Sequence, residues 1–170
     1  RADELLAIGV AKGESEGRPL LVQMSILSCR SWLDLGDPVA ADHAARRGVK
    51  VSMSQTRLLA CRAEALRRQG WLDEAGELVS RPWNELAETP YLDAVEVRVL
   101  VDRGRLAEAR EVAARLPDTD DPEILASRWY LARALRSPEA ARWAARYEGV
   151  PRPEGRTLER YVPVGAVGGP

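Results

Sequence analysis

The sequence contains no phenylalanine, one histidine (His43) and two cysteines, Cys29 and Cys61. With a single histidine and no CxxC pair, no zinc site or other metal site is expected. His43 lies inside a predicted helix and is interpreted as a surface or packing residue. Each cysteine lies in an apolar helical run, so we expect two small buried thiols rather than a redox pair, which fits a reducing compartment.

An excess of one charge and long apolar runs are also missing. The net charge is −1, lysine occurs only at Lys12 and Lys50, and acidic residues are interleaved with the arginines, so nucleic acid is not an expected partner. No signal peptide and no run of about 18 apolar residues occurs, which predicts a cytoplasmic chain without membrane contact. The arginine- and alanine-rich composition favours a bacterial source. A start at Arg1 favours a piece of a longer protein.

Motifs of catalysis are absent as well. The sequence has no glycine-rich phosphate loop, no G-x-S-x-G elbow and no HExxH motif, so neither an enzyme nor a cofactor is expected. The acidic run 118–121 lacks the glycine and the terminal glutamate of a calcium loop and is interpreted as a helix cap. The tryptophans are spread along the chain and are expected to fill gaps between packed helices: Trp32, Trp71, Trp83, Trp129 and Trp143.

What the sequence does contain is an internal repeat. Gly36, Gly70 and Gly104 follow one another at intervals of 34 residues, and an alanine lies five residues after each, at positions 41, 75 and 109. A looser fourth copy has Arg136 in the glycine position and Ala141 in the alanine position. A glycine just past a helix can adopt the left-handed conformation that ends it, and a small alanine lets two helix axes approach. The repeat therefore predicts the tight bends of four helical hairpins.

The runs on each side of these bends predict the helices. First helices are expected at 19–35, 54–69, 90–103 and 122–135, and second helices at 38–47, 72–81, 106–116 and 138–147. Four pairs of an N-cap residue and a proline mark helix starts: Asp37-Pro38, Thr89-Pro90, Asp121-Pro122 and Ser137-Pro138. Taken alone, the alternating stretch Val95–Val99 indicates a strand. Because it occupies a first-helix position, we predict helix there.

The remaining segments are assigned by composition. Residues 2–12 resemble the second helix of a preceding hairpin, and 13–17 are expected to form a polar linker. The hairpins are expected at 19–48, 54–82, 89–117 and 121–149, within one domain of residues 1–150. Proline and glycine exclude a long helix in residues 151–170, which are expected to form an extended tail or linker. This tail is expected to lie along a neighbouring surface, such as the concave groove of its own or another copy.

The 34-residue helix–turn–helix period resembles that of the tetratricopeptide repeat family over about residues 20–150. The second repeat carries the family pattern at Leu59, Ala63, Leu66, Gly70, Leu72, Ala75 and Val79, and the third at Val97, Leu100, Gly104, Leu106, Ala109 and Ala113. The first carries it at Cys29, Trp32, Gly36, Ala41 and Ala45, and the fourth at Leu125, Trp129, Ala141, Ala145 and Pro153. The family's aromatic positions are mostly aliphatic here, and the second and third repeats lack the terminal proline.

The resemblance implies an all-α fold, a right-handed α-solenoid of about four antiparallel hairpins, and a protein or peptide ligand on the concave face of the first helices. The candidate ligand-binding residues are Arg30, Arg57, Glu64, Arg67, Tyr91, Arg98, Tyr130 and Arg133. Arginine pairs with carboxylates and stacks on aromatic rings, so an acidic peptide or the chain's own tail is the expected ligand. A homodimer through the tail or by end-to-end stacking is a further possibility. An ordinary solvated helix face is the competing interpretation of these arginines.

A different function remains open. The segment is also compatible with the sensor or regulatory part of a multidomain signalling protein, such as a transcriptional regulator or a repeat-gated protease or ATPase. A fold of this kind does not by itself identify a function.

Overall fold

The computed structural model describes residues 14–52, 55–80, 90–151 and 156–162. These residues form helices and short connections, with no strand among them, which confirms the predicted all-α class. The longer elements are α2 (Glu14–Asp34), α3 (Pro38–Val51), α4 (Thr56–Arg68), α5 (Leu72–Val79), α6 (Pro90–Asp102), α7 (Leu106–Arg115), α8 (Pro122–Ala134) and α9 (Glu139–Glu148), followed by the short 3₁₀ helix η2 (Leu158–Tyr161). The helix expected at 2–12 lies outside the described residues.

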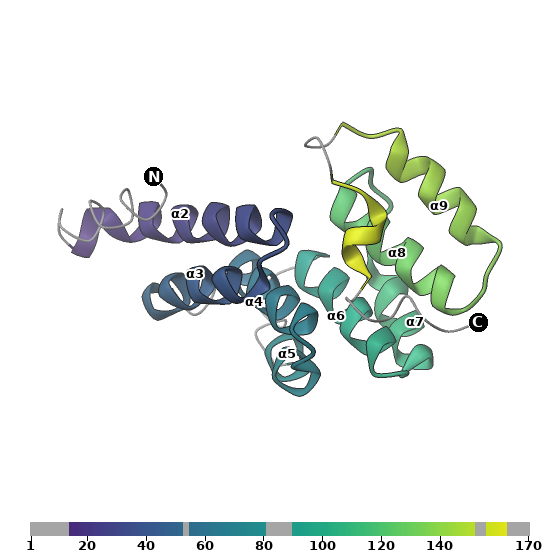
Figure 1. Cartoon of the computed structure of the whole chain (residues 1–170), viewed down its shortest axis with the longest axis horizontal. Helices are drawn as coiled ribbons and strands as arrows, with labels where there is room; N and C mark the ends of the chain where they lie inside the picture. Colours follow the sequence, from purple (N-terminus) through teal and green to yellow (C-terminus); the bar gives the residue numbers. More distant parts are fainter. Residues whose placement is uncertain (1–13, 53–54, 81–89, 152–155, 163–170) are drawn as a thin grey trace.

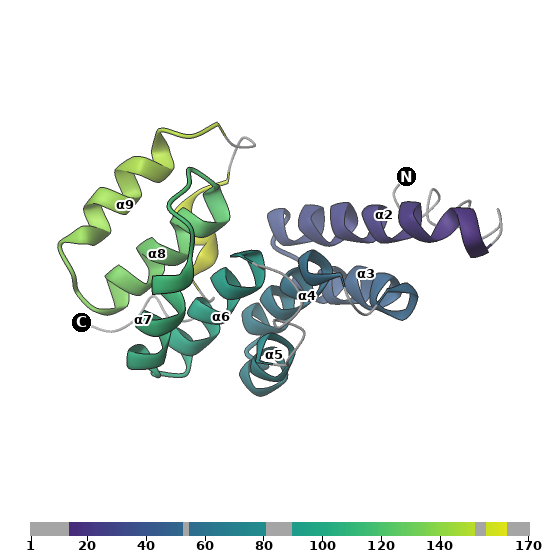
Figure 2. The ribbon, with the colours of Figure 1, turned by 180° about the vertical axis from the view of Figure 1, so that it is seen from behind.

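Consecutive helices pair as hairpins, and the hairpins follow one another through the molecule. The pairs are α2–α3, α4–α5, α6–α7 and α8–α9, and the first helices α2, α4, α6 and α8 each contact the next. The second helices α3, α5 and α7 also contact the first helix of the following hairpin. The molecule is elongated, with α2 and α3 at one end and α8 and α9 at the other (Figures 1 and 2).

The bends between paired helices share one backbone geometry. Gly36, Gly70 and Gly104 have φ angles of +79°, +83° and +73°, in the left-handed region that glycine adopts without a steric penalty. The amide after each glycine donates back to a carbonyl five residues earlier, as in Trp71 N to Leu66 O at 3.0 Å. This arrangement satisfies carbonyls that the end of a helix leaves open. Arg136 adopts the same region at the fourth bend, with φ +51°.

The predicted helix starts also follow local chemistry. Asp37 caps α3 by accepting from Ala40 N at 2.9 Å, and Asp121 caps α8 by accepting from Glu123 N at 2.9 Å. Asp121 of the acidic run is therefore a cap, as predicted, whereas Asp118 and Asp120 form ion pairs with Arg146 of α9. At the fourth bend the helix begins at Glu139, one residue later than predicted, and the Ser137 hydroxyl accepts from its amide at 3.3 Å. Thr89 lies outside the described residues, and α6 begins at Pro90.

The stretch Val95–Val99 is helical, as predicted against its strand-like pattern. Val95, Val97 and Val99 are all buried, although they point in different directions around α6. The reason is the position of α6, which contacts α4, α5, α7 and α8. A helix that is enclosed by neighbours becomes apolar around much of its surface, which weakens the usual helical periodicity.

The core forms four clusters along the molecule, each made by one hairpin and the element that follows it. Ala41, Ala75 and Ala109 are fully buried at the hairpin contacts. The fourth alanine, Ala141, was expected to be equivalent but is exposed. The fourth copy is shorter, and Trp143 makes the contact with α8 instead. In this last cluster η2 takes the position that the next first helix fills elsewhere.

The tryptophans differ in how far they are buried. Trp129 and Trp143 are buried between helices and Trp32 packs against the first cluster, which agrees with the prediction. Trp71 is exposed, because it lies at the bend before α5 rather than inside a helix contact. Trp83 lies outside the described residues.

The prediction of a polar linker at 13–17 is wrong for residues 14–17, which the structure describes. The helix α2 begins at Glu14 and continues through Gly17 and Pro19. Glutamate is a good helix former, and the helix contains Pro19 in its second turn, where the missing amide removes one backbone hydrogen bond. Polar composition predicts exposure more directly than it predicts the absence of a helix.

The expectation of two separate thiols is also wrong, because Cys29 and Cys61 form a disulfide. Cys29 lies on α2 and Cys61 on α4, and their Cα atoms are 6.4 Å apart. The packing of α2 against α4 brings these positions together, although Cys29 corresponds in the repeat to Ala63 and not to Cys61. The bond therefore joins the first hairpin to the second.

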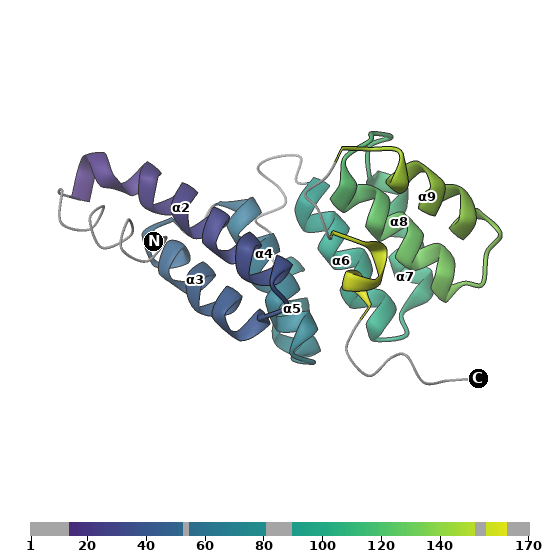
Figure 3. The same cartoon turned by 45° about the horizontal axis from the view of Figure 1, so that its top comes forward.

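The tail is not simply extended. Leu158–Tyr161 form one 3₁₀ turn, and the side chains of Leu158 and Tyr161 are 5% and 2% exposed. These two side chains are buried against α8 and α9, which stabilises the turn. Figure 3 shows the turn beside α6 and α8, on the side that faces the end of α2.

Candidate functional site

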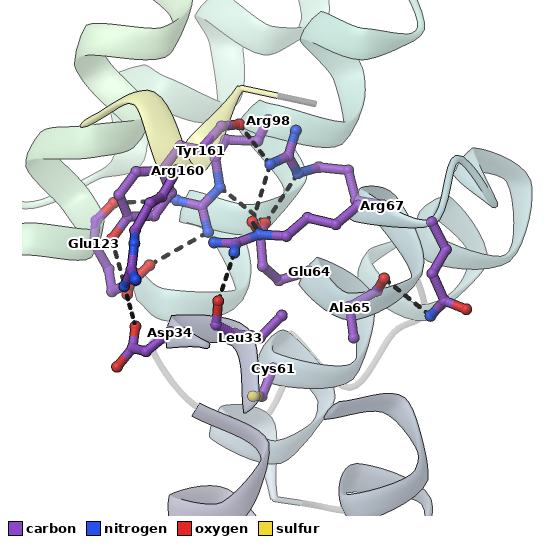
Figure 4. A network of polar contacts seen from close by, with 12 residues as sticks. Leu33, Asp34, Cys61, Glu64, Ala65, Arg67, Arg98, Glu123, Arg160 and Tyr161 are labelled. Carbon is purple, nitrogen blue, oxygen red and sulfur yellow. Dashed lines mark hydrogen bonds and ion pairs between the residues drawn. The ribbon is translucent and has the colours of Figure 1, made fainter. Parts of the chain in front are cut away.

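A buried carboxylate, Glu64 of α4, lies between three arginines (Figure 4). It pairs with Arg67 at 2.9 Å (Nη2 to Oε1), with Arg68 at 2.7 Å (Nε to Oε1) and with Arg98 of α6 at 3.1 Å (Nε to Oε2). Burial alone would raise the pKa of Glu64, but the arginines outweigh burial and hold that pKa well below its usual value. Glu64 therefore stays ionised and fixes the guanidinium groups around it.

The other donors of this network connect α4, α6 and α8. Arg67 Nη1 lies 2.6 Å from Asp102 Oδ2, and the Tyr130 hydroxyl donates to the second oxygen of Asp102. Arg98 Nη1 lies 2.6 Å from the Ser127 hydroxyl oxygen. Because Arg67 and Arg98 are each only 1% exposed, these contacts form a buried polar layer inside the molecule.

Residues 156–162, the docked segment, pack onto this layer. The backbone carbonyl of Tyr161 accepts a hydrogen bond from Arg67 Nη2 at 2.6 Å, and the phenolic hydroxyl of Tyr161 donates to Glu123 at 3.1 Å. The Tyr161 ring meets the Tyr147 ring edge to face, with centroids 6.4 Å apart. A buried arginine thus binds the backbone of a segment that lies 94 residues further along the chain.

Cations also lie against the Tyr161 ring. The guanidinium carbons of Arg98 and Arg68 are 5.0 Å and 5.8 Å from its centroid. Burial raises the pKa of the Tyr161 phenol well above its usual value, and the nearby Glu123 carboxylate raises it further. Tyr161 is therefore a neutral hydrogen-bond donor between two arginines.

The docked segment reaches the first hairpin through Asp34, at the end of α2. Arg156 Nε donates to Asp34 at 3.1 Å, and Arg160 Nη1 lies 3.6 Å from the same carboxylate. Arg156 also lies 3.7 Å from Glu123. The Arg156–Asp34 pair connects residues 122 positions apart, and the three ion pairs together join the segment to α2 and α8.

Beside the docked segment lies a hollow between α2, α4 and α6. Its apolar surface comes from Ile26, Leu33, Ala60, Cys61 and Val95. Its polar surface comes from Arg30, Asp34, Arg57, Glu64, Arg68, Tyr91, Arg98, Glu123, Arg156, Arg160 and Tyr161. The enclosed volume is about 50 Å³, which is room for a few water molecules or for the end of one side chain.

The outer wall of the hollow contains two arginines that share one aromatic ring. Arg57 and Arg30 lie 4.9 Å and 6.0 Å from the centroid of Tyr91. The Tyr91 hydroxyl donates to Asp121 at 2.8 Å, which fixes the ring. Within the described part of the chain, neither Arg30 nor Arg57 has an ion pair. This wall is therefore positively charged and open to an anionic group.

The structure brings most of the sequence-predicted residues together, but some of them are accessible and others are buried. Arg30, Arg57 and Tyr91 line the accessible part of the hollow. Buried members of the set already have partners inside the molecule: Glu64, Arg67, Arg98 and Tyr130. Arg133 is exposed and lies over Trp129, 5.4 Å from that ring and outside the hollow.

Several residues of the site were not selected from the sequence: Asp34, Arg68, Glu123, Arg156, Arg160 and Tyr161. Asp34 and Glu123 are at helix ends, where an acidic residue looks like an ordinary surface charge. The tail itself carried a usable signal. Leu158 and Tyr161 are apolar residues three positions apart in a stretch flanked by Pro and Gly, which is the spacing of one helical turn.

Among the described residues, no group of His, Cys, Asp and Glu side chains is arranged to hold a metal ion, and none of the helices is long and apolar enough to cross a bilayer. The fold and the site together define an all-helical protein built of successive hairpins, with an arginine- and tyrosine-rich hollow on one side. No match was found among protein-family models, curated proteins or solved structures.

Proposed function

We propose that this protein is a peptide-binding helical-repeat module, a right-handed α-solenoid of the tetratricopeptide type. The 34-residue spacing of the bends and the contacts of each hairpin with the next support the repeat architecture. In such an array the first helices line one continuous surface, which suits a short segment of a partner protein.

The observation that carries this proposal is the docked segment. The first-helix side already holds a short stretch of polypeptide, with its backbone bound to Arg67 and its tyrosine buried between helices. The chemistry that a peptide ligand requires, a backbone donor together with an aromatic pocket, is therefore present on this side.

The open wall of the hollow supplies the accessible contacts. Arg30 and Arg57 are positioned by the Tyr91 ring and have no ion pair among the described residues. A carboxylate of the bound partner would pair with them, and an aromatic group would stack on them. Loss of one such charge-assisted contact costs about 1.5–3 kcal/mol, which is roughly a 10-fold to 100-fold change in affinity.

A selection experiment tests the proposal. Random short peptides displayed on phage are selected against the immobilised full chain, and the enriched peptides are measured by fluorescence anisotropy. We expect Arg30→Ala and Arg57→Ala to weaken their binding by about 10-fold or more. Arg110→Ala is the matched control, because Arg110 is an exposed arginine on α7 outside the hollow. Equal binding by all three variants would refute a ligand in the hollow.

A further inference from the structure

The docked segment describes the chemistry of the ligand that its site accepts. Resting on the proposed function above, we infer that the partner segment carries a leucine and a tyrosine three residues apart, with arginine beside them. Residues 156–162, of sequence Arg-Thr-Leu-Glu-Arg-Tyr-Val, are the intramolecular copy of this ligand, and the partner replaces them. This class differs from the acidic peptide expected from the arginines alone.

The apolar spacing follows from the turn. In a 3₁₀ helix, side chains three residues apart lie on the same side, so Leu158 and Tyr161 enter the core together. They pack with Leu125 of α8 and Tyr147 of α9. A ligand with a different spacing would place one of the two side chains in water.

Tyrosine is specified by its hydroxyl as well as its ring. The hydroxyl donates to Glu123, a partly buried carboxylate that otherwise has its ion pairs with Arg98 and Arg156. Phenylalanine would fill the same space but would leave that carboxylate oxygen without this donor. The site is therefore selective for tyrosine over phenylalanine.

Arginine in the ligand is specified by Asp34. Both Arg156 and Arg160 lie within ion-pair distance of this carboxylate, and Arg156 reaches Glu123 as well. Acidic residues at these two positions would face Asp34 and Glu123 with like charge. Arg67 binds a backbone carbonyl, which any residue supplies, so this contact holds the segment while the leucine and tyrosine positions set its register.

Competition follows from shared contacts. Residues 156–162 already occupy the backbone donor of Arg67 and the hydroxyl acceptor of Glu123, so a second segment of this class cannot bind these groups at the same time. A partner segment must therefore displace residues 156–162. Because the chain's own segment is tethered, its effective concentration is high, and an untethered peptide binds weakly until that segment is released.

The test uses the full chain and a fluorescein-labelled peptide of the sequence Arg-Thr-Leu-Glu-Arg-Tyr-Val. Tyr161→Ala empties the tyrosine position of the protein, and circular dichroism checks that its helices remain. We expect the peptide to bind Tyr161→Ala at least about 10-fold more tightly than it binds the wild-type chain. A peptide with both arginines replaced by glutamate, and one with phenylalanine for tyrosine, should each bind Tyr161→Ala at least about 10-fold more weakly than the parent peptide.

A second variant covers the case in which Tyr161→Ala loses its fold. The double variant Arg156→Ala and Arg160→Ala keeps Tyr161 but removes the ion pairs to Asp34 that hold the segment. It should also bind the labelled peptide more tightly than the wild type does. Arg105→Ala is its control, because it removes an exposed ion pair, with Glu108, that involves no residue of the docked segment.

The inference is overturned if a folded Tyr161→Ala chain does not bind the peptide, because residues 156–162 would then only cap the last hairpin. It is also overturned if the glutamate-substituted peptide binds equally well, or if two copies exchange the segment and elute as a dimer. The proposed function is judged separately by the effects of Arg30→Ala and Arg57→Ala on the selected peptides. Peptides that depend on these arginines but lack the Leu–Tyr spacing would uphold the function and refute this ligand class.

Discussion

Breaking the Cys29–Cys61 disulfide is expected to lower the stability of the fold by an amount that can be worked out from the chain. The two cysteines are 32 residues apart, and closing a loop of that length in the unfolded chain corresponds to about 3.7 kcal/mol at 25 °C. Typical domains are stable by about 5–15 kcal/mol, so this is a large share. For a chain of this size the loss corresponds to a decrease in Tm of roughly 7–15 °C.

Reduction separates the cross-link from the packing of the two sulfur atoms. Reduced cysteines keep both sulfurs in the core, where a free thiol behaves as a small apolar group. Urea unfolding, followed by circular dichroism with and without a phosphine reductant, therefore measures the cross-link alone. The Cys29→Ala and Cys61→Ala double variant should unfold at the same urea concentration in both conditions, which controls for other effects of the reductant.

The outcome also reports on the packing of the first two hairpins. If the free energy of unfolding of the wild-type chain changes by less than about 1 kcal/mol on reduction, the loop-closure reasoning is refuted. A titration of free thiols in the unfolded, unreduced chain should find none. Two free thiols there would show that α2 and α4 do not hold the cysteines together.

Three further changes test other parts of the structure. Glu64→Gln should lower the free energy of unfolding by about 3–5 kcal/mol, because it leaves buried arginines without their carboxylate. The arginines depress the pKa of Glu64 in the folded state, so its stabilising effect is present above its unfolded-state pKa, near 4.5, and is lost as the pH falls toward its folded-state pKa. The urea midpoint should therefore decrease less with falling pH in Glu64→Gln than in the wild type. Arg136→Gly should raise the melting temperature, because a left-handed conformation costs a residue other than glycine about 1–2 kcal/mol. Arg133→Gly, inside α8, should lower the melting temperature. A lower melting temperature in both variants would contradict the bend geometry. Asp121→Ala should lower the free energy of unfolding by about 1–2 kcal/mol, because it removes the α8 cap, and Asp121→Asn should recover most of this loss in the same urea assay.

The features of the fold that depend on residues close together in the sequence were predictable. The glycine positions identified three bends, and the structure places all three residues at positive φ. The Asp-Pro pairs identified the starts of α3 and α8, since a side-chain cap and a fixed φ act within one turn. The strand-like stretch in α6 was assigned correctly only because its place in the repeat outweighed its local pattern.

The candidate site was predictable only in part. Selecting first-helix positions found Arg30, Arg57 and Tyr91, because the helical period places them on one side. The same selection could not separate accessible arginines from buried ones: Arg67 and Arg98 have the same charge as Arg30 but are enclosed by Glu64 and the docked segment. Burial depends on what packs against a helix from elsewhere in the chain.

The amino-acid sequence by itself determined the helices, their bends and the order of the hairpins, because these depend on hydrogen bonds and backbone preferences within a few residues. Only the tertiary structure decided that Cys29 meets Cys61, that Glu64 is enclosed by arginines, and that Arg67 binds the backbone of Tyr161. Each of these contacts joins different elements, and the last joins residues 94 positions apart. Such contacts form when packed helices bring distant residues together, and no local pattern encodes them.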